Sequence, residues 1–206
     1  MKFLSKVIFI SYLASFQIFL GLSEFYFVRH GQTNFNIKKE LKNWNMSIND
    51  VGVQQIKSLK DSIKELSIRN LFFSPLIRAR ETKNIIQKYL RVCEVSLPEI
   101  KEAQEGLYSE ILSLKNSNKC LCSRALKKFL NRLSRGIFKI LECPKLSLVV
   151  GHGTVYAGIC YILDVNTDIW RINNGSLVHF YQNKDGSWQV ELINDGSKNI
   201  DNMDIN

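Results

Sequence analysis

Short apolar runs alternate with longer amphipathic segments along most of the chain. Runs of β-favouring apolar residues predict buried strands at 25–28, 70–73 and 146–150, and a weaker alternation predicts another at 92–97. Apolar residues at helical spacing predict four helices, from Asn49 to about Leu66 and over residues 76–90, 119–141 and 154–163. Two runs at 176–182 and 187–193 flank Asn-Lys-Asp-Gly and predict a hairpin. This order predicts an α/β fold, a three-layer α/β/α sandwich around a mostly parallel, doubly wound sheet.

Three local features refine the expected helix ends and loops. Asn49 has a side chain suited to capping the helix that follows it. Ser74-Pro75 predicts a second helix start, with the serine as N-cap and the proline at the first helical position. Residues 107–118 are polar and poorly patterned, which is typical of a flap over an active site.

Residues 1–23 differ in composition from the rest of the chain. Two lysines precede an uncharged, mostly apolar run that ends at small residues, as in a signal peptide with its cleavage site. The run is short for a membrane span, but an uncleaved anchor is one alternative, and a segment unrelated to the folded domain is another. We therefore expect a domain over 24–195 in an exported protein, periplasmic or secreted, with a membrane-anchored or cytoplasmic location as the alternatives. The polar residues 196–206 predict a flexible tail.

Length and charge narrow the classes of partner. The 206 residues suit one folded domain, and a net charge of +9 favours anionic partners. The sequence has neither zinc-ligand spacing nor aromatic residues interleaved with basic ones, so nucleic acid is not expected. The cations of the 119–141 helix are interpreted as a solvated face, with attraction of an anionic substrate as the alternative. Five cysteines fit no metal motif and are interpreted as core residues or free thiols, at positions 93, 120, 122, 143 and 160.

Candidate chemistry gathers where the predicted strands end. Arg29-His30-Gly31 follows the first strand, Arg78 lies early in the helix after the second, and His152-Gly153 follows the strand at 146–150. Parallel strands bring their carboxyl ends to one edge of a sheet, where ligands bind. Arginines and free backbone N–H groups at helix starts both bind phosphate-like oxyanions. No carboxylate or cysteine is evident beside the histidines, so we expect no metal site.

A neutral histidine in such a pocket can act as a nucleophile. Adjacent cations disfavour imidazolium, so the ring would attack phosphorus and form a phosphohistidine. The leaving alkoxide then needs a proton from a carboxylic acid on a nearby loop. Three glutamates between the third strand and the polar flap are available for this role: Glu99, Glu102 and Glu105.

Five blocks of the chain resemble the histidine phosphatase superfamily, the phosphoglycerate-mutase-like proteins. Residues 29–36 resemble its R-H-G-x-T-x-x-N signature, and residues 74–82 its S-P-L-x-R-A-x-x-T stretch. Residues 49–55 resemble T-x-x-G-x-x-Q with asparagine first, and 97–106 resemble the acid loop L-x-E-x-x-x-G. Residues 149–153 resemble the strand of the second histidine. The blocks follow the order of the family, and they imply its fold.

The resemblance also assigns roles to individual residues. It implies that His30 is the phosphorylated nucleophile, that Glu102 is the acid and base, and that His152 assists catalysis. Glu102 is preferred because it alone stands four residues before Gly106. The family usually has a bulky residue just before that glycine, whereas this chain has Glu105. A substrate-binding set is implied as well, comprising Arg29, Gly31, Thr33, Asn36 and Arg78. Neither a metal nor another cofactor is implied.

Several reactions share this machinery. Glycolytic mutases of the family are longer after the acid loop and carry N-E-R-H-Y-G there, whereas this chain has about 45 residues between Gly106 and His152 and lacks that motif. The resemblance therefore favours a phosphomonoesterase acting on small phosphorylated substrates. Phosphoglycerate mutase-type transfer, a phosphoprotein phosphatase and a non-catalytic phospho-ligand binding module are the alternatives. A membrane partner is expected only if the N-terminal segment is an uncleaved anchor, and the oligomeric state is left open.

Overall fold

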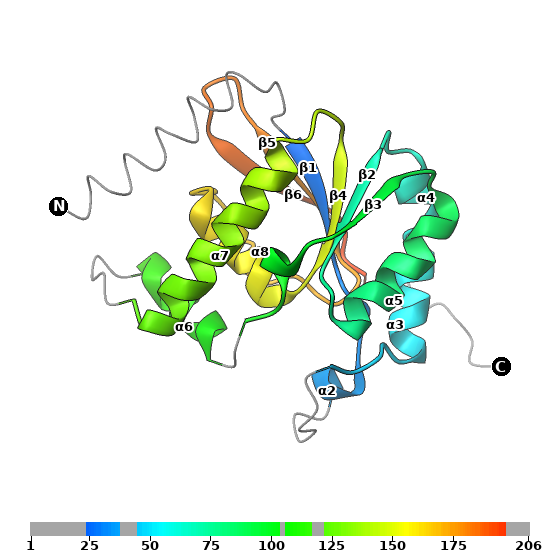
Figure 1. Cartoon of the computed structure of the whole chain (residues 1–206), viewed down its shortest axis with the longest axis horizontal. Helices are drawn as coiled ribbons and strands as arrows, with labels where there is room; N and C mark the ends of the chain where they lie inside the picture. Colours follow the sequence, from blue (N-terminus) through cyan, green and yellow to red (C-terminus); the bar gives the residue numbers. More distant parts are fainter. Residues whose placement is uncertain (1–23, 38–44, 104–105, 117–121, 197–206) are drawn as a thin grey trace.

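A mixed six-stranded sheet forms the centre of the protein in the computed structural model, which describes residues 24–37, 45–103, 106–116 and 122–196 (Figure 1). Its strands, in chain order, are β1 (Glu24–Arg29), β2 (Asn70–Phe73), β3 (Cys93–Ser96), β4 (Ser147–Gly151), β5 (Leu177–Gln182) and β6 (Trp188–Asn194). The α-helices are α2 (Asn34–Ile37), α3 (Asp50–Ser58), α4 (Lys60–Lys64), α5 (Ile77–Ile86), α6 (Leu107–Asn116), α7 (Arg124–Leu141) and α8 (Gly153–Ile162). Two short 3₁₀ helices are η1 (Gln87–Tyr89) and η2 (Pro98–Ile100).

The strand order β3-β2-β4-β1-β5-β6 places β1 inside the sheet. β1 pairs in parallel with β4 and antiparallel with β5. β2 is parallel to both β3 and β4, whereas β5 and β6 form the predicted antiparallel hairpin. The carboxyl ends of β1, β2 and β4 therefore lie at one edge, as the sequence predicted for the residues that follow them.

Helices cover both faces of the sheet, which confirms the predicted three-layer α/β/α architecture (Figure 1). Alternate residues of β1 divide between the two layers, because successive side chains of a strand point to opposite faces. Phe25 and Phe27 join the core under α6, α7 and α8, whereas Val28 joins the core under α3, α4 and α5. β4 divides in the same way, with Val149 on the first side and Val150 on the second.

Two helix predictions differ from the structure. The helix expected from Asn49 to about Leu66 is interrupted at Leu59, where α3 ends and α4 begins, although Ile56, Leu59 and Ile63 are buried as predicted. Residues 107–116 form α6 and not an irregular flap. Leu107 and Ile111 lie one helical turn apart and are buried in the core, so tertiary packing stabilises a helix that the weak apolar pattern did not predict.

Two predicted helix starts also change. Asn49 caps α3 as expected, accepting a hydrogen bond from the Gly52 N–H. Ser74 does not cap α5, which begins after Leu76. The first N–H of α5, at Ile77, donates to the Asn45 side chain at 2.8 Å, which supplies the missing cap from a distant loop. α7 begins at Arg124, five residues after the predicted start, and Ser123 caps it.

Some predictions fall outside the part of the chain that the structure describes. The signal peptide or anchor at 1–23 and the tail from 197 onward are among them. None of the helices in the described ranges is long and apolar enough to span a membrane. Cys93, Cys122, Cys143 and Cys160 are free thiols, whereas Cys120 lies outside the described residues.

Candidate active site

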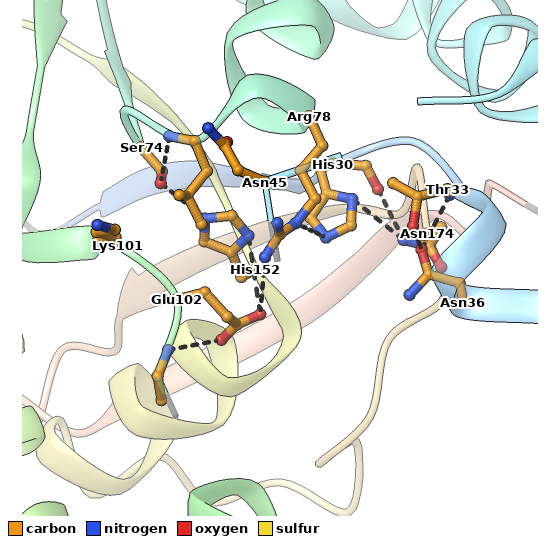
Figure 2. Close-up of polar contacts among 12 residues, drawn as sticks. His30, Thr33, Asn36, Asn45, Ser74, Arg78, Lys101, Glu102, His152 and Asn174 are labelled. Carbon is orange, nitrogen blue, oxygen red and sulfur yellow. Dashed lines mark hydrogen bonds and ion pairs between the residues drawn. The ribbon is translucent and has the colours of Figure 1, made fainter. Parts of the chain in front are cut away.

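The predicted strand ends converge on one buried cluster. His30 follows β1, Arg78 lies in the first turn of α5 after β2, and His152 follows β4 (Figure 2). The ring centroids of the two histidines are 5.2 Å apart. The Glu102 side chain reaches this cluster from the loop after η2.

His30 is held as a neutral ring whose Nε2 atom faces Arg78. The Nδ1–H group donates to the Gly31 carbonyl oxygen at 2.8 Å, which leaves the lone pair on Nε2. Arg78 Nε donates to Nε2 at 3.1 Å. Burial, followed by the charges of Arg78 and Arg29, lowers the pKa of His30 well below its ordinary value. The ring is therefore neutral near pH 7, with its basic nitrogen at the site.

The turn after His30 depends on a close contact between two backbones. A Cβ atom added to Gly31 would lie 2.6 Å from the Gly52 carbonyl oxygen, so both positions exclude a side chain. The Gly31 N–H donates to Thr82 Oγ1, and the Gln32 N–H donates to Gln55 Oε1. The blocks at 49–55 and 74–82 therefore fix the backbone that carries His30.

Two guanidinium groups, of the half-buried Arg29 and the buried Arg78, give the site its positive charge. Arg29 NH1 donates to the Ile172 carbonyl oxygen at 2.6 Å, and Arg78 is 8% exposed. Burial lowers the pKa of both groups, yet arginine remains cationic at neutral pH. Arg29 Nε and His152 Nδ1 are buried without a hydrogen-bond partner among the described residues. Unpaired buried donors beside two cations favour an oxyanion as the ligand.

His152 is positioned by Ser74, which the sequence interpreted as a helix cap. The Ser74 hydroxyl lies 2.7 Å from His152 Nε2 and also accepts from the Leu76 N–H at 3.4 Å. A hydroxyl group can both donate and accept, so this contact fixes the orientation of the ring and directs Nδ1 at the cluster. Burial, then the neighbouring His30 and Arg78, lowers the pKa of His152 well below its ordinary value. A neutral ring thus faces the cluster through Nδ1, which has no hydrogen-bond partner among the described residues.

Glu102 is the carboxyl group that lies at the cluster. Its Oε2 atom is 3.7 Å from His152 Nδ1 and 3.9 Å from Arg78 NH2, and Oε1 accepts from the Ala103 N–H. Burial raises the pKa of Glu102 above its ordinary value, although Arg78 opposes the shift. Glu99, by contrast, pairs with Lys139 at 2.6 Å, which lowers the pKa of Glu99. Glu105 lies outside the described residues.

Asn36 and Thr33 have different roles from those of the two arginines. Asn36 is exposed and lines a pocket of about 450 Å³ together with Arg29, Glu102 and Arg171. Thr33 is buried, and its N–H and hydroxyl both donate to Asn36 Oδ1. Thr33 thus positions the Asn36 amide, and its contact with the substrate stays a prediction.

The family model of the histidine phosphatase superfamily (branch 1) matches residues 25–196. The chain belongs to this family. The match confirms the resemblance that the five motif blocks indicated.

Known relatives of this histidine phosphatase differ in length. Agropine synthesis reductase of Rhizobium rhizogenes is 29% identical over 198 residues, covering 88% of this chain and 44% of that protein. The uncharacterized phosphatase PhoE of Bacillus subtilis (strain 168) is 28% identical over 135 residues, covering 61% of this chain and 69% of that protein. The chain thus spans less than half the length of the reductase.

Solved structures share the fold. YhfR of Bacillus stearothermophilus has a TM-score of 0.64 at 16% identity, covering 84% of this chain and 98% of that chain. The alpha-ribazole phosphatase from Shigella flexneri has a TM-score of 0.60 at 18% identity, covering 84% and 96%. Phosphoserine phosphatase from Entamoeba histolytica, in complex with 3-phosphoglyceric acid, has a TM-score of 0.61 at 18% identity, covering 84% and 96%. These likenesses show that the chain shares their fold.

One expectation about the cluster in this histidine phosphatase is wrong. A carboxylate does lie beside the histidines, because ligand-type atoms of His30, Glu102 and His152 all lie within 4.8 Å of one another. Arg29 and Arg78 act electrostatically on all three groups. Two fixed cations beside the cluster oppose the binding of a divalent cation, so the donor set suits an oxyanion better than a metal ion.

Sequence reasoning missed several side chains around the site. Asn174 donates to the His30 carbonyl oxygen at 3.0 Å from the loop before β5. Tyr108 and Arg171 line the pocket, with the Arg171 guanidinium stacked 5.2 Å over the Tyr108 ring. The Asn173-Asn174-Gly175 turn was the available signal for the first of these. The two pocket-lining residues had no motif around them.

Proposed function

We propose that the protein is a metal-independent phosphomonoesterase that acts on small phosphorylated substrates through a phosphohistidine intermediate. The observation that carries this proposal is the state of His30. Its Nδ1–H is committed to the Gly31 carbonyl, and its neutral Nε2 lies beside two fixed cations. A nucleophile that needs no deprotonation, set in an oxyanion site, suits in-line attack on a phosphoryl group.

The first step transfers the phosphoryl group to the protein. Arg78 shifts its Nε–H from His30 Nε2 to a phosphoryl oxygen, which frees the Nε2 lone pair. That lone pair attacks phosphorus, and the bond between phosphorus and the ester oxygen breaks. Glu102 gives its proton to the departing oxygen, as its raised pKa allows. The Gly31 carbonyl accepts the Nδ1–H of the ring as that ring becomes positively charged. Arg29, Arg78 and the Nδ1–H of His152 bind the equatorial oxygens and compensate their charge.

The second step returns the protein to its starting state. Glu102, now a carboxylate, takes a proton from a water molecule, and the water oxygen attacks phosphorus. The bond between phosphorus and Nε2 breaks, and its electron pair returns to the imidazole. Inorganic phosphate then leaves the site. Two guanidinium groups take the charge-neutralising part that a divalent cation has in other phosphoryl transfers, which is why no metal is required.

The experiment uses the whole chain with p-nitrophenyl phosphate and, separately, 3-phosphoglycerate. We expect hydrolysis that survives chelation of divalent cations and is lost in His30→Ala, with little isomerisation of 3-phosphoglycerate. A matched control is His179→Gln, because His179 lies in β5 and pairs with Glu24. Acid-labile, base-stable labelling after rapid quenching should appear in the wild type and be absent in His30→Ala.

Three results would overturn parts of this proposal. Undiminished hydrolysis by His30→Ala would exclude the covalent mechanism. Isomerisation faster than hydrolysis would favour the mutase alternative. Binding of phosphate esters without turnover of any ester would favour a non-catalytic binding module.

A further inference from the structure

A second cavity of about 790 Å³ runs along α7 on the other side of Glu102. Its lining includes three apolar, largely buried residues, Ala103, Leu107 and Phe129, which we call its floor, and the Arg132 guanidinium lies 5.3 Å over the Phe129 ring. Four of its lining residues are cations from α7, namely Arg124, Lys128, Arg132 and Arg135. Glu102 is the single acidic residue among the described residues that line it. We call this cavity the α7 groove.

The four cations form a row along one side of the helix. Their spacings of four, four and three residues keep successive side chains on one face, since a helix turns once in about 3.6 residues. At about 1.5 Å of rise per residue, the row extends roughly 16 Å along the axis. α7 lies next to α6 in the helical layer on one face of the sheet (Figure 1), and Arg124, Lys128 and Arg135 of the row are exposed. The row is therefore a surface feature large enough to meet several anionic groups at once.

Three of these cations are available for a ligand. Arg132 already donates to the carbonyl oxygens of Pro98 and Lys101. Arg124, Lys128 and Arg135 are exposed, and they form no hydrogen bond or ion pair with other described residues. A solvated basic face is the simple interpretation of such cations. The apolar floor beneath them indicates a binding site, because a solvated helix face does not require a lined groove.

The position of Glu102 links the groove to catalysis. Glu102 lines both the α7 groove and the pocket that contains Arg29 and Asn36. In the proposed mechanism its carboxyl group touches the oxygen that joins phosphorus to the leaving group. The leaving group must therefore begin beside Glu102 and extend away from the phosphoryl group. The α7 groove is lined by that same residue.

We propose that the α7 groove binds the leaving group, and that the substrates are small organic polyphosphates, whose leaving group carries at least one further phosphate. This proposal rests on the proposed function for the role of Glu102. A second phosphate on the rim would be bound by Arg124, Lys128 or Arg135, since each can donate charge-assisted hydrogen bonds. The organic part of the leaving group would cover Phe129 and its apolar neighbours on the floor.

The test compares two nucleotides that differ by one phosphate, adenosine 5′-monophosphate and adenosine 3′,5′-bisphosphate. The groove variant is Arg124→Gln, Lys128→Gln, Arg135→Gln, which retains Arg132 because of its contacts to the acid loop. The matched control is Lys57→Gln, Lys60→Gln, Lys64→Gln, which removes three exposed cations from α3 and α4, under the opposite face of the sheet. Phosphate release gives kcat/KM for each nucleotide with each protein.

We expect the wild type and the control to prefer the bisphosphate, and the groove variant to lose that preference by roughly 10- to 100-fold. Binding of both nucleotides to His30→Ala, with and without the groove substitutions, measures the same preference without turnover. If hydrolysis fails to depend on His30 but this binding preference still falls with the groove substitutions, the mechanism is wrong and the groove assignment holds. An unchanged preference in the groove variant would overturn the groove assignment. A phosphopeptide rich in acidic residues that is hydrolysed better than the bisphosphate, with the same dependence on the groove, would overturn the choice of a small substrate.

Discussion

The phosphate pocket and the acid loop are built in different ways. The pocket residues His30, Arg78 and His152 follow strands that pair with one another inside the sheet. Glu102 follows β3, which pairs only with β2 among the described strands and lies at the edge of the sheet. Its loop is held from outside by α7, through hydrogen bonds of Arg132 to the Pro98 and Lys101 carbonyls.

Because of this difference, the residues that bind the phosphoryl group are held independently of the loop that serves the leaving group. The geometry of the pocket depends on hydrogen bonding between the strands and on side chains that are buried at the carboxyl edge of the sheet. The position of the acid depends on side-chain contacts from one amphipathic helix. α7 approaches so closely that a Cβ atom on Gly136 would lie 2.8 Å from the Glu99 Cβ atom. Changes in α7 should therefore alter leaving-group use without changing the phosphate site.

The largest effect is expected on the pocket side, in Arg78→Lys. Lysine keeps the charge but cannot both donate to His30 Nε2 and bind phosphate oxygens through a planar fork. We expect kcat/KM to fall about 1000-fold with every phosphate ester, whatever its leaving group. The control is Arg80→Lys, an exposed arginine of the same helix. A loss confined to poor leaving groups would contradict the division between the two regions.

Glu102→Gln should have a smaller and more selective effect. A poor leaving group such as the alkoxide of glycerol 3-phosphate needs the proton, whereas p-nitrophenolate does not. We expect about a 100-fold loss of kcat/KM with glycerol 3-phosphate and only a severalfold loss with p-nitrophenyl phosphate. Glu99→Gln, in the same loop, should change the ratio of the two rates little. Equal losses with both esters would assign the acid to another residue.

The sequence predicted the structure of the phosphate pocket better than it predicted the structure around the acid loop. His30, Arg78 and His152 follow strongly apolar strands, so their meeting at one sheet edge follows from the common direction of parallel strands. The contact of Thr33 with Asn36 was not predicted, because a motif specifies residue types and not their hydrogen-bond partners. Ser74 was misassigned because a serine before a proline has the pattern of a cap. α6 and the α7 groove depend on how two helices pack against each other and against the acid loop, which local patterning does not determine.

Stability should fall in acid because of the two buried histidines. The pKa of His30 and of His152 is lowered in the folded protein. Below about pH 6.5 these two histidines therefore bind protons in the unfolded chain but stay neutral in the folded protein. The free energy of unfolding should therefore decrease as the pH falls through that range. Between pH 7.5 and 5.5 each histidine contributes at most about 1.4 kcal/mol.

Urea denaturation at the two pH values measures this loss. In His152→Asn the loss attributable to the two histidines should be about halved, so the difference between the two proteins isolates one buried ring. An identical loss in both proteins would mean that His152 accepts a proton in the folded state. His179→Gln provides the control for removing a histidine outside the pocket.

The smallest effect tests whether α7 positions the acid. Arg132→Gln removes the guanidinium that holds the Pro98 and Lys101 carbonyls, so the loop carrying Glu102 should loosen. We expect about a fivefold loss with glycerol 3-phosphate relative to p-nitrophenyl phosphate. Lys127→Gln, an exposed cation of α7 that does not line the groove, is the control.

Two further proteins separate positioning from simple charge. Arg132→Lys keeps the cation but lacks the fork that reaches two carbonyls, so it should resemble Arg132→Gln if the contact positions the loop. In a Glu102→Gln background, Arg132→Gln should cause no further change in the ratio of kcat/KM values for the two esters. The carboxylic acid that Arg132 positions is already absent from that protein. Wild-type discrimination by Arg132→Lys, or a full additional loss in the double variant, would show that Arg132 acts through its charge in the groove and not through Glu102.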